Sequence, residues 1–571
     1  MYKYLIIFAF LSFSILLSCA QTEANDYEGE WIGHLPDRNS FNFEIRLEKL
    51  AENEYQLLIS NDKPLLNKKV NSSSKDHLQF NIEDQLDLNF YKHGKTRQLS
   101  GFIKSGRFYY HLDLQEQEPH VYMGKWNPFM VHKGLISDDV MLYMEYDAES
   151  ELVAYPFFGD QRFRGTWTSG FKQKGNTLYY QDSNTGFNFR SRLSGESVSL
   201  EIYLVDALIT KTQLRHANDW EYKRDPDPEG QGPQTPESLE DGWETANIRD
   251  FGFKEDKLLR MIDRVKDNSL VNTHSILIAK EGNLVFENYF EGFNAHIPHD
   301  LRSASKSISS ATIGIAIDEE IIKGVDEKLY DFIPQKYQYT KDKQKAEISL
   351  KDLLTMSSGL DVNKQASENY YQDPRNTDNW LKTVLEAPMV NEPGSYADYG
   401  SANPFLLGVC LSERLDKPVE VYMHEKLFAP LGITNYINQS DETKERPYFG
   451  GGMLLTPRDL LKFGQLFLNK GSWKGKRIIS ESWVEESTQK HVRLQDYEDK
   501  NEYGYQWWHD SYEVNGQKIN AIEARGAGGQ FIFILPQLES VVVITSGNFR
   551  NGKGNQARTI LKDYILPAMV F

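Results

Sequence analysis

The chain has 571 residues and a formal net charge of −18 at pH 7, with 40% hydrophobic and 13% aromatic residues. This length exceeds what one hydrophobic core supports and predicts several domains, while the apolar content excludes wholesale disorder. A strongly acidic surface repels phosphate backbones, and no cluster of Lys and Arg offsets it, so nucleic acid is excluded as a partner.

The N-terminus has the features of an export signal. A single positive charge precedes an apolar run from Leu5 to Leu17, which is shorter than a confident membrane span. Leu16-Leu17-Ser18-Cys19 resembles a bacterial lipobox, in which the cysteine is acylated after export. We expect residues 1–19 to be a signal peptide and Cys19 to anchor a periplasmic or cell-surface lipoprotein; ordinary cleavage after Ala20 is the alternative.

The cysteine and histidine content argues against metal and cofactor chemistry. Cys19 and Cys410 are the two cysteines, too few for a disulfide framework or a Cys-rich zinc site. The 13 histidines are scattered and form no His-Glu-x-x-His motif. The run from Gly552 to Ala557 imitates a dinucleotide fingerprint, but too little chain follows it for a βαβ unit. We therefore expect no metal and no cofactor.

The first part of the chain, residues 25–223, has the pattern of β-structure. Phe41, Phe43, Ile45 and Leu47 alternate with polar residues, which is typical of a strand with one wet face. A Gly-x-Trp unit recurs, ending at Trp31, Trp126 and Trp167. Short strands at this spacing predict all-β barrel or sandwich modules, here residues 25–125 and 126–223. The tryptophans are expected to fill the cores of these modules.

The pattern changes after a Pro- and Gly-rich acidic segment, which predicts a linker over residues 224–246. Beyond it we expect one domain, residues 247–571, in which strands at both ends enclose many helices. This order predicts an α+β fold whose sheet is completed by both ends of the domain. The main predicted elements are strands at Ser275–Ala279, Leu284–Tyr289, Phe531–Leu535 and Val541–Thr545, and helices at Lys306–Ile322, Asp459–Asn469 and from Asn555 on.

The segment Ser303-Ala304-Ser305-Lys306 carries the candidate chemistry. A loop precedes it and an apolar stretch follows, so Ser303 is expected at the start of a buried helix with Lys306 one turn later on the same face. Burial would lower the pKa of Lys306 and let it take the hydroxyl proton. The helix N-terminus and the Ser303 N–H would stabilise the developing oxyanion. The alternative is that Ser303 is an ordinary N-cap residue.

Further segments in order strengthen this interpretation. Together they resemble the class C β-lactamase family, which includes penicillin-binding D-aminopeptidases, family VIII esterases and nylon-oligomer hydrolases. The resemblance covers about Asn247 to Phe571 and leaves the β modules aside. The matching segments are Ser303–Lys306, Leu353–Leu360, Pro393-Gly394, Tyr399-Gly400-Ser401, Gly451–Leu460, Tyr503–Trp508 and Gly526–Gln530.

The resemblance implies a β-lactamase/transpeptidase-like domain, an antiparallel sheet flanked by helices with a helical subdomain. It implies Ser303 as nucleophile, Lys306 as base, and Tyr399 as the tyrosine that relays a proton to the leaving group. Tyr396 and simple packing are the alternatives for the tyrosine. We expect a neighbouring cation, with Lys306 the candidate, to lower the pKa of the Tyr399 phenol.

Two departures from the family pattern affect substrate binding. Ser401 stands where the family usually has Asn, and Ala524-Arg525-Gly526 replaces the usual Lys or His, Thr and Gly. Of these, Arg525 is the residue expected to bind a substrate carboxylate. Ser401 and Gly526 are also expected at the substrate, and the N–H of Ala527 is expected to complete the oxyanion hole with that of Ser303.

The sequence thus predicts an exported serine hydrolase that cleaves an ester or amide of a small molecule or peptide through an acyl-enzyme. A β-lactamase or D-amino-acid peptidase is the alternative within the same chemistry. A catalytically silent surface binding lipoprotein is the alternative from another class. A Gly-x-Ser-x-Gly elbow is absent, which disfavours an α/β-hydrolase. The oligomeric state and the substrate stay open.

Overall fold

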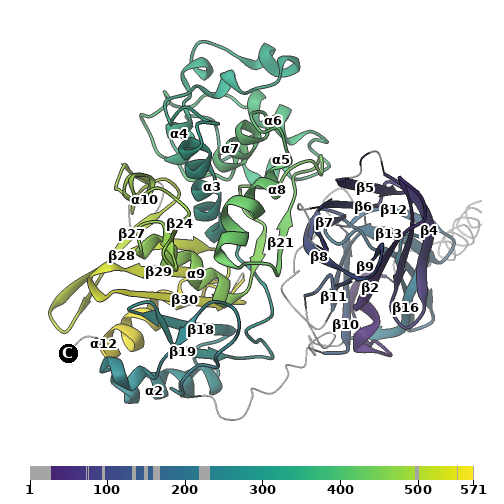
Figure 1. The fold of residues 1–571 in the computed structure, drawn as a ribbon, viewed down its shortest axis with the longest axis horizontal. Coiled ribbons are helices and arrows are strands. Elements are labelled where there is room, and N and C mark those ends of the chain that lie inside the picture. The colour runs from purple at the N-terminus through teal and green to yellow at the C-terminus, as the bar shows by residue number, and fades with distance from the viewer. Residues whose placement is uncertain are drawn as a thin grey trace, which may run out of the picture.

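A computed structural model describes residues 27–72, 74, 76–92, 97–130, 137–146, 152–158, 168–217, 232–495, 501–549 and 551–569. Figure 1 shows a β-rich lobe, coloured purple to blue, beside a larger lobe of helices and strands, coloured teal to yellow. Cys19, with its predicted lipid anchor, and Trp167 lie outside the described residues. Within the described part, no helix has the length and apolar character needed to span a bilayer.

The β-rich lobe contains two sheets. Among the described residues, eight strands form the first, in the order β11-β10-β1-β16-β15-β14-β13-β12. Their bounds are β1 (Gly29–His34), β10 (Asp139–Tyr146), β11 (Leu152–Phe158), β12 (Thr168–Lys174), β13 (Thr177–Asp182), β14 (Asn188–Ser194), β15 (Ser197–Leu204) and β16 (Ala207–His216).

The second sheet is barrel-like and continues into the C-terminal lobe. Its path is β20-β22-β21-β8-β9-β2-β3-β4, with β5, β6 and β7 following on β8. The strands of the β-rich lobe are β2 (Phe43–Lys49), β3 (Glu54–Ser60), β4 (Pro64–Asn71), β5 (His77–Ile82), β6 (Leu86–Lys92), β7 (Gln98–Ser105), β8 (Phe108–Glu118) and β9 (Val121–Trp126). Those of the C-terminal lobe are β20 (His299–Asp300), β21 (Tyr436–Gln439) and β22 (Met453–Leu455).

One hydrophobic cluster fills the β-rich lobe. The alternation in β2 gives the expected faces, with Phe43, Ile45 and Leu47 buried. Trp31 and Trp126 are each 1% exposed, as expected of core residues. Strand β1, from the first predicted module, pairs with β10 and β16 of the second, and side chains from both halves share the cluster. The two predicted modules are therefore closely joined in space.

The C-terminal lobe is an α+β domain around an antiparallel sheet, as predicted. Within the described residues nine strands form it, in the order β17-β19-β18-β30-β29-β28-β27-β26-β25, with β17 parallel to β19. The two ends of the domain meet where β18 pairs with β30. The bounds are β17 (Glu244–Thr245), β18 (Thr273–Lys280), β19 (Asn283–Tyr289), β25 (Val492–Arg493), β26 (Glu502–Tyr503), β27 (Trp508–Val514), β28 (Gln517–Gly526), β29 (Gln530–Leu535) and β30 (Ser540–Ser546).

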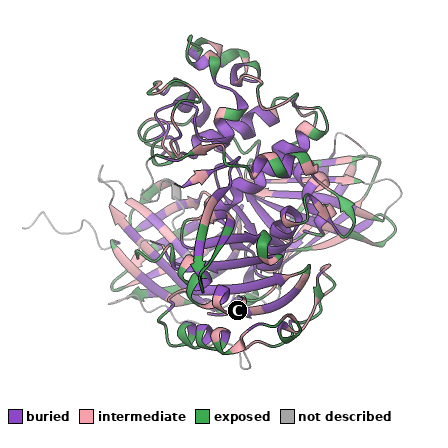
Figure 2. Cartoon of the chain, turned by 90° about the vertical axis from the view of Figure 1, so that its left-hand side faces the viewer, coloured by how far each residue is buried: buried purple, intermediate pink, exposed green. Residues whose placement is uncertain are grey.

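Helices cover both faces of this sheet because its strands are apolar on both sides. Ile276 and Ile278 of β18 pack with α2 (Glu255–Lys266) and the C-terminal helices α11 (Gln556–Ile560) and α12 (Leu566–Met569). Leu277 and Ala279 face the opposite layer, which includes α3 (Lys306–Asp318) and α9 (Pro457–Leu468). Figure 2 shows buried residues along the strands and exposed ones on the outer helices.

A helical subdomain stands above one end of the sheet (Figure 1). Its helices are α4 (Leu350–Leu354), α5 (Glu368–Tyr371), α6 (Trp380–Glu386), α7 (Ala402–Ser412) and α8 (Val419–Met423). Nearer the sheet lie a further helix, α10 (Glu481–Ser487), and a small hairpin of β23 (Ser472–Trp473) and β24 (Lys476–Arg477) (Figure 1). Helix α3 ends four residues before its predicted limit because Glu320 takes a left-handed conformation, with φ +57°.

The segment predicted as a linker has its C-terminal end packed on the C-terminal lobe. Trp243 is 3% exposed within the core of that lobe. Its indole N–H donates to the Arg458 carbonyl over 3.2 Å. The Arg458 guanidinium in turn binds the carboxylates of Asp241 and Glu287. Residues from Asp241 on therefore contribute to the fold of the lobe that follows them.

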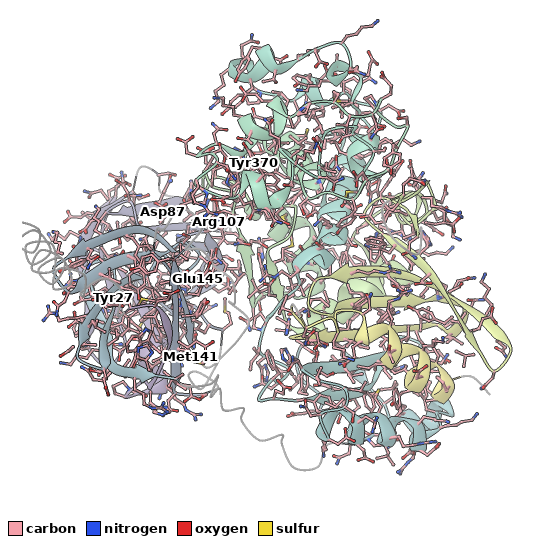
Figure 3. All side chains as sticks on the ribbon, turned by 180° about the vertical axis from the view of Figure 1, so that it is seen from behind. Tyr27, Asp87, Arg107, Met141, Glu145 and Tyr370 are labelled. Atoms are coloured by element: carbon pink, nitrogen blue, oxygen red, sulfur yellow. The ribbon has the colours of Figure 1, made fainter. Side chains whose placement is uncertain are left out.

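The two lobes are joined through a shared sheet and an interlocked core. Strand β8 pairs with β21, with Tyr110 opposite Ile437. The side chain of Tyr109 is fully buried in the core of the C-terminal lobe, whereas Tyr110 points into the β-rich core. Lys104 forms an ion pair of 2.7 Å with the buried Glu420. Figure 3 labels Arg107 at the edge of the β-rich lobe that faces this junction.

Candidate active site

A short 3₁₀ turn, η4 (Arg302–Ser305), carries Ser303 into the start of α3. The turn is fixed on the sheet side, where the Leu301 N–H donates to the Met453 carbonyl over 2.9 Å. Arg302 has φ +48°, an uncommon conformation for a residue with a side chain, and one found often at functional sites. The cap positions of η4 and α3 are Leu301 and Ser305, so Ser303 is not an N-cap residue.

Lys306 reaches back to Ser303 as the one-turn spacing predicts. Its ammonium nitrogen lies 2.9 Å from Ser303 Oγ and 3.1 Å from Ser401 Oγ, and it also donates to the Gly450 carbonyl. The side chain is buried, at 1% exposure. Burial lowers the pKa of Lys306 to about 8, against the opposing influence of the Glu368 carboxylate.

Tyr399 lies beside this pair. Its ring centroid is 5.4 Å from Lys306 Nζ, and the ring packs against Trp508 and Tyr503. Burial raises the pKa of the Tyr399 phenol, although a hydrogen bond with Ser303 acts in the opposite direction. The expectation of a lowered pKa is therefore wrong: the Arg525 cation does act to lower it, but the loss of water on burial outweighs this charge. Tyr399 keeps its proton and can act as a hydrogen-bond donor to Ser303 or to a leaving group.

Ser401 contacts the lysine, and its hydroxyl is engaged on two sides. It accepts from Lys306 and donates to Glu368 Oε2 over 3.1 Å. The other oxygen of Glu368 accepts from Tyr448 over 2.8 Å, and Tyr448 lies 2.5 Å from the hydroxyl of Tyr371. Sequence reasoning missed Glu368, since nothing distinguishes it among 82 acidic residues until the fold brings it beside Ser401.

The end of strand β28 packs directly against the turn that carries Ser303. A Cβ atom on Gly526 would lie 2.1 Å from the Leu301 carbonyl and 3.1 Å from the Ala304 nitrogen. Only glycine allows this approach. Ala527 follows at once, in the turn between β28 and β29. The structure thus brings together the two segments whose N–H groups were predicted to form the oxyanion hole.

Replacing Gly526 with Ala should therefore damage both stability and activity. The new side chain must push β28 away from the turn, at a cost of about 1–3 kcal/mol of unfolding free energy. A displacement near 1 Å at the nucleophile lowers kcat/KM by about 100-fold. Gly324→Ala is the matched control, because its added Cβ meets nothing within 4 Å. Equal activities of the two variants would show that the contact is not important.

Arg525 does not have the free guanidinium that carboxylate binding requires. Its Nε donates to Glu523 over 2.7 Å, and its Nη atoms donate to Asn501 and Asp510 over 3.2 and 3.1 Å. The guanidinium also stacks on Trp508 at 4.8 Å. Its guanidinium thus already binds the carboxylates of Glu523 and of Asp510, which also pairs with Arg558, and this weighs against its predicted role at the substrate. Arg525 instead supports Trp508, the residue that packs against Tyr399.

Hydrogen bonds between two other predicted motifs and α3 stabilise the site without contacting Ser303. Gln506, in the Tyr503–Trp508 segment, donates from its side-chain amide to the carbonyls of Leu353 and Leu354. Ser307, on α3, donates to the Gln506 carbonyl over 2.7 Å. These bonds tie α3 to the segment that contains α4. The Leu353–Leu360 and Tyr503–Trp508 segments therefore position the nucleophile helix.

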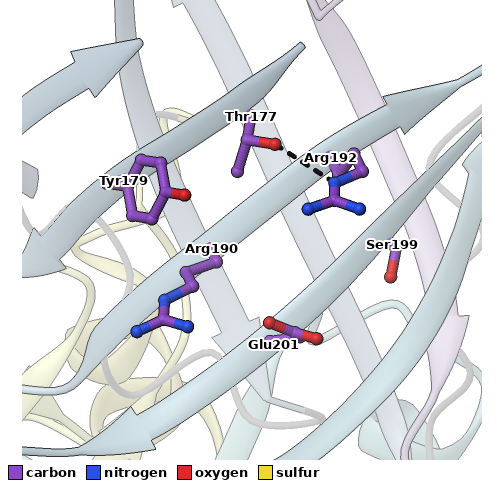
Figure 4. Close-up of a pocket in the computed structure, with 6 residues that line it drawn as sticks. All are labelled: Thr177, Tyr179, Arg190, Arg192, Ser199 and Glu201. Atoms are coloured by element: carbon purple, nitrogen blue, oxygen red, sulfur yellow. Dashed lines mark hydrogen bonds between the residues drawn. The ribbon is translucent and has the colours of Figure 1, made fainter. Parts of the chain in front are cut away.

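Two polar clusters lie elsewhere, in the β-rich lobe. A cavity of about 110 Å³ on β13 to β15 is lined by Thr177, Tyr179, Arg190, Arg192, Ser199 and Glu201 (Figure 4). Its arginines are already engaged, Arg192 with Thr177 and Arg190 with Tyr203. Among the described residues, the side chains that could together hold a metal ion are His34, Asp138 and Asp139. His34 and Asp139 pair directly at 2.8 Å.

A family model and several known proteins match part of this chain. A family model described as Beta-lactamase matches residues 261–565. The 6-aminohexanoate-dimer hydrolase of Paenarthrobacter ureafaciens is 24% identical over 298 residues, which are 48% of this chain and 71% of that protein. The structure of a penicillin binding protein from Bacillus halodurans covers 53% of this chain and 98% of its own, with 15% identity and a TM-score of 0.41.

A family VIII carboxylesterase covers 52% of this chain and 91% of its own, with 16% identity and a TM-score of 0.40. The family model spans more than half of the chain and includes the region from Ser303 to Ala527 that surrounds the buried lysine. The chain therefore belongs to the β-lactamase family and is a serine hydrolase of that family.

Proposed function

We propose that the protein is an exported hydrolase that cleaves an ester or amide through an acyl-enzyme on Ser303. The observation that supports this most is the 2.9 Å contact between Ser303 Oγ and a buried Lys306. The names of its relatives, an aminohexanoate-dimer hydrolase and a carboxylesterase, fit an amide or ester substrate.

In the proposed reaction, neutral Lys306 takes the Ser303 proton as Oγ attacks the substrate carbonyl carbon. The N–H groups of Ser303 and Ala527 stabilise the oxyanion. Tyr399, which keeps its proton, donates it to the leaving oxygen or nitrogen and regains one from the Lys306 ammonium. The carbon–heteroatom bond breaks, leaving the acyl group on Ser303. Water then attacks this ester and gives up a proton to Lys306. The bond between the acyl carbon and Ser303 Oγ breaks, Oγ takes the proton from the Lys306 ammonium, and the acid is released.

A fluorophosphonate probe tests the nucleophile. We expect it to label wild-type protein at Ser303 and not to label the Ser303→Ala variant. Hydrolysis of p-nitrophenyl butyrate should fall to background in the same variant. Wild-type activity in Ser303→Ala would refute the proposal. A wild-type protein that is neither labelled nor active would favour the silent binding lipoprotein instead.

The β-lactamase alternative is tested with nitrocefin. A β-lactam carries a carboxylate, and the guanidinium expected to bind it is committed to Glu523 and Asp510. Without that charged hydrogen bond, we expect turnover of nitrocefin to be roughly 10- to 100-fold less efficient than in an enzyme that makes it. Efficient nitrocefin hydrolysis would establish the alternative.

The pH dependence of kcat/KM reports the base. Lys306 acts only after losing its proton, and its pKa is about 8. We therefore expect kcat/KM to rise with pH, by about tenfold per unit below 8, and to level off above. Burial raises the pKa of Tyr399, so no loss is expected as far as about pH 10. A flat profile between about pH 6 and 9 would exclude a lysine base.

Export and lipid anchoring complete the proposal. They rest on the apolar run before Cys19 and on the lipobox-like sequence around it. Radiolabelled palmitate should enter the full-length protein in a bacterial host that acylates lipoproteins, and should not enter a Cys19→Ser variant. Incorporation that is the same in both would place the lipid elsewhere, and none in either would favour simple secretion.

A further inference from the structure

Lys306 makes three polar contacts, and these decide where its lone pair points. A neutral amine has two N–H donors and one lone pair. The Gly450 carbonyl can only accept, so it takes one N–H. Ser401 and Ser303 are hydroxyls, each able to donate or accept. The orientation of the base therefore depends on which of these two hydroxyls donates to it.

Glu368 settles this choice. The hydroxyl of Ser401 has one proton, and it points to Glu368 Oε2 at 3.1 Å. Because that proton is committed to a carboxylate, Ser401 can only accept from Lys306. Both N–H groups of the neutral lysine are then used, by Ser401 and Gly450. The lone pair is left facing Ser303, the hydroxyl that it is proposed to deprotonate.

The orientation of Glu368 is itself fixed by buried tyrosines. Tyr448 donates to Glu368 Oε1, and Tyr371 then has to donate to Tyr448, because the single Tyr448 proton is already used. Burial raises the pKa of both phenols, so they stay protonated and keep these roles. Arg107, from the β-rich lobe, adds positive charge beside Tyr448 and Glu368.

We propose that Glu368 is a positioning residue for the base: by accepting the Ser401 proton, its carboxylate directs the lone pair of Lys306 to Ser303 and places a negative charge beside the lysine. The proposal rests on the proposed roles of Ser303 and Lys306. The Ser303→Ala variant tests those roles separately.

The effect of the Glu368 charge on Lys306 depends on burial, on solvent and on the other charged groups around the site. The Glu368 carboxylate acts to raise the pKa of Lys306, whereas burial lowers it. Glu368 is itself an exposed residue, so water screens part of the effect of its charge. Elements from both lobes contribute titratable or charged groups that face this site. They are Asp300 from β20, Lys306 from α3, Tyr371 from α5, Tyr399 before α7, Tyr448 from the loop before β22, and Arg107 from the turn before β8.

Glu368→Gln provides the test, measured as the pH profile of kcat/KM with p-nitrophenyl butyrate. An amide keeps the shape but removes the charge. With its oxygen on Tyr448, its NH₂ group faces Ser401 and reverses that hydroxyl, which then competes for the lone pair of Lys306. We expect the rising limb to move to lower pH by about 0.5–1 unit. The plateau should fall about tenfold, the cost of one lost charged hydrogen bond.

Glu442→Gln is the matched control. Glu442 is a partly buried glutamate that, like Glu368, lies near Arg107, and it accepts from the backbone N–H of Trp380 over 2.6 Å. Burial raises the pKa of Glu442 to about 7, and glutamine imitates its protonated form. The rising limb of the pH profile of Glu442→Gln should therefore stay at the wild-type position. An unmoved limb in Glu368→Gln, or an equal shift in Glu442→Gln, would overturn the proposal.

A second variant keeps the test decisive if Glu368→Gln does not fold. Ser401→Ala retains the carboxylate but removes the hydroxyl between it and the lysine. We expect the rising limb of its kcat/KM profile to lie near that of wild type, and the plateau of kcat/KM to be lowered by about tenfold. A wild-type plateau would overturn the role of the Ser401 contact. Activity that depends on Ser303 but ignores Glu368 would refute this inference alone, whereas activity that survives Ser303→Ala would refute the proposed function.

Discussion

Lys306→Met should nearly abolish hydrolysis while leaving the protein folded. Methionine fills a similar volume but has no base, and removal of general base catalysis lowers kcat/KM by about 10²–10⁴-fold. The variant also removes an ionisable group from a buried position, which offsets the hydrogen bonds lost to Ser401 and Gly450. We expect the unfolding free energy to change by less than about 2 kcal/mol. Paired activity assays and urea titrations measure both effects.

Lys462→Met is the control that separates catalysis from burial. Lys462 is as buried as Lys306, but it lies on α9 and pairs with Asp459 at 2.8 Å. Its removal leaves a buried carboxylate without its partner, at a cost of about 3–5 kcal/mol. We expect this variant to lose stability and, while folded, to keep its kcat/KM. A large loss of stability in Lys306→Met, with activity kept, would reverse the assignment of the two lysines.

The second large effect concerns the β-rich lobe. A fragment of residues 232–571 should fail to give a stable, active enzyme. It loses Tyr109 and Phe102 from the core of the C-terminal lobe, and it exposes the edge of β21 that pairs with β8. The buried Glu420 also loses Lys104. Circular dichroism melting and p-nitrophenyl butyrate hydrolysis, compared with the full chain, provide the measurement.

A single substitution tests the same junction without removing a lobe. Tyr109→Ala empties a fully buried site between the lobes and should cost about 3–5 kcal/mol of stability. Hydrolysis should become more sensitive to temperature in this variant. A fragment that melts cooperatively and hydrolyses substrate at the rate of the full chain would show that the C-terminal lobe is independent, and would contradict the argument from the shared sheet.

The junction gives the β-rich lobe a structural link to the nucleophile. The shared sheet continues from β8 through β21 and β22 to β20, which ends three residues before Ser303. Arg107 donates to the Ser440 carbonyl and stacks on Trp380, at 2.8 and 4.6 Å. The lobe therefore supports the side of the site on which Tyr448 and Glu368 lie.

Local sequence patterns predicted the chemistry best where a short spacing fixes geometry. Ser303 and Lys306 are one helical turn apart, so any helix start at this point brings them together. The alternation in β2 and the apolar strands β18, β29 and β30 were likewise predicted, because side-chain period and burial are local properties. The chain order of the motifs predicted the family.

Sequence reasoning did less well where the answer depends on partners far along the chain. Arg525 looked available for a carboxylate until the fold placed Asn501 and Asp510 around it. The pKa of Tyr399 was expected to fall, but burial by Trp508 and Tyr503 raises it. Nothing in the sequence predicted a role for Glu368, since that role depends on Ser401 and Tyr448, which are more than thirty residues away along the chain.

The sequence by itself determined the serine hydrolase domain, its α+β class and the pair of residues proposed to start the reaction. Only the tertiary structure decided how the base is oriented, which charges surround it and how the β-rich lobe joins the domain. The reason is physical. Helix and strand periods act over a few residues, whereas burial, hydrogen-bond direction and electrostatic fields depend on groups that only the folded chain brings together.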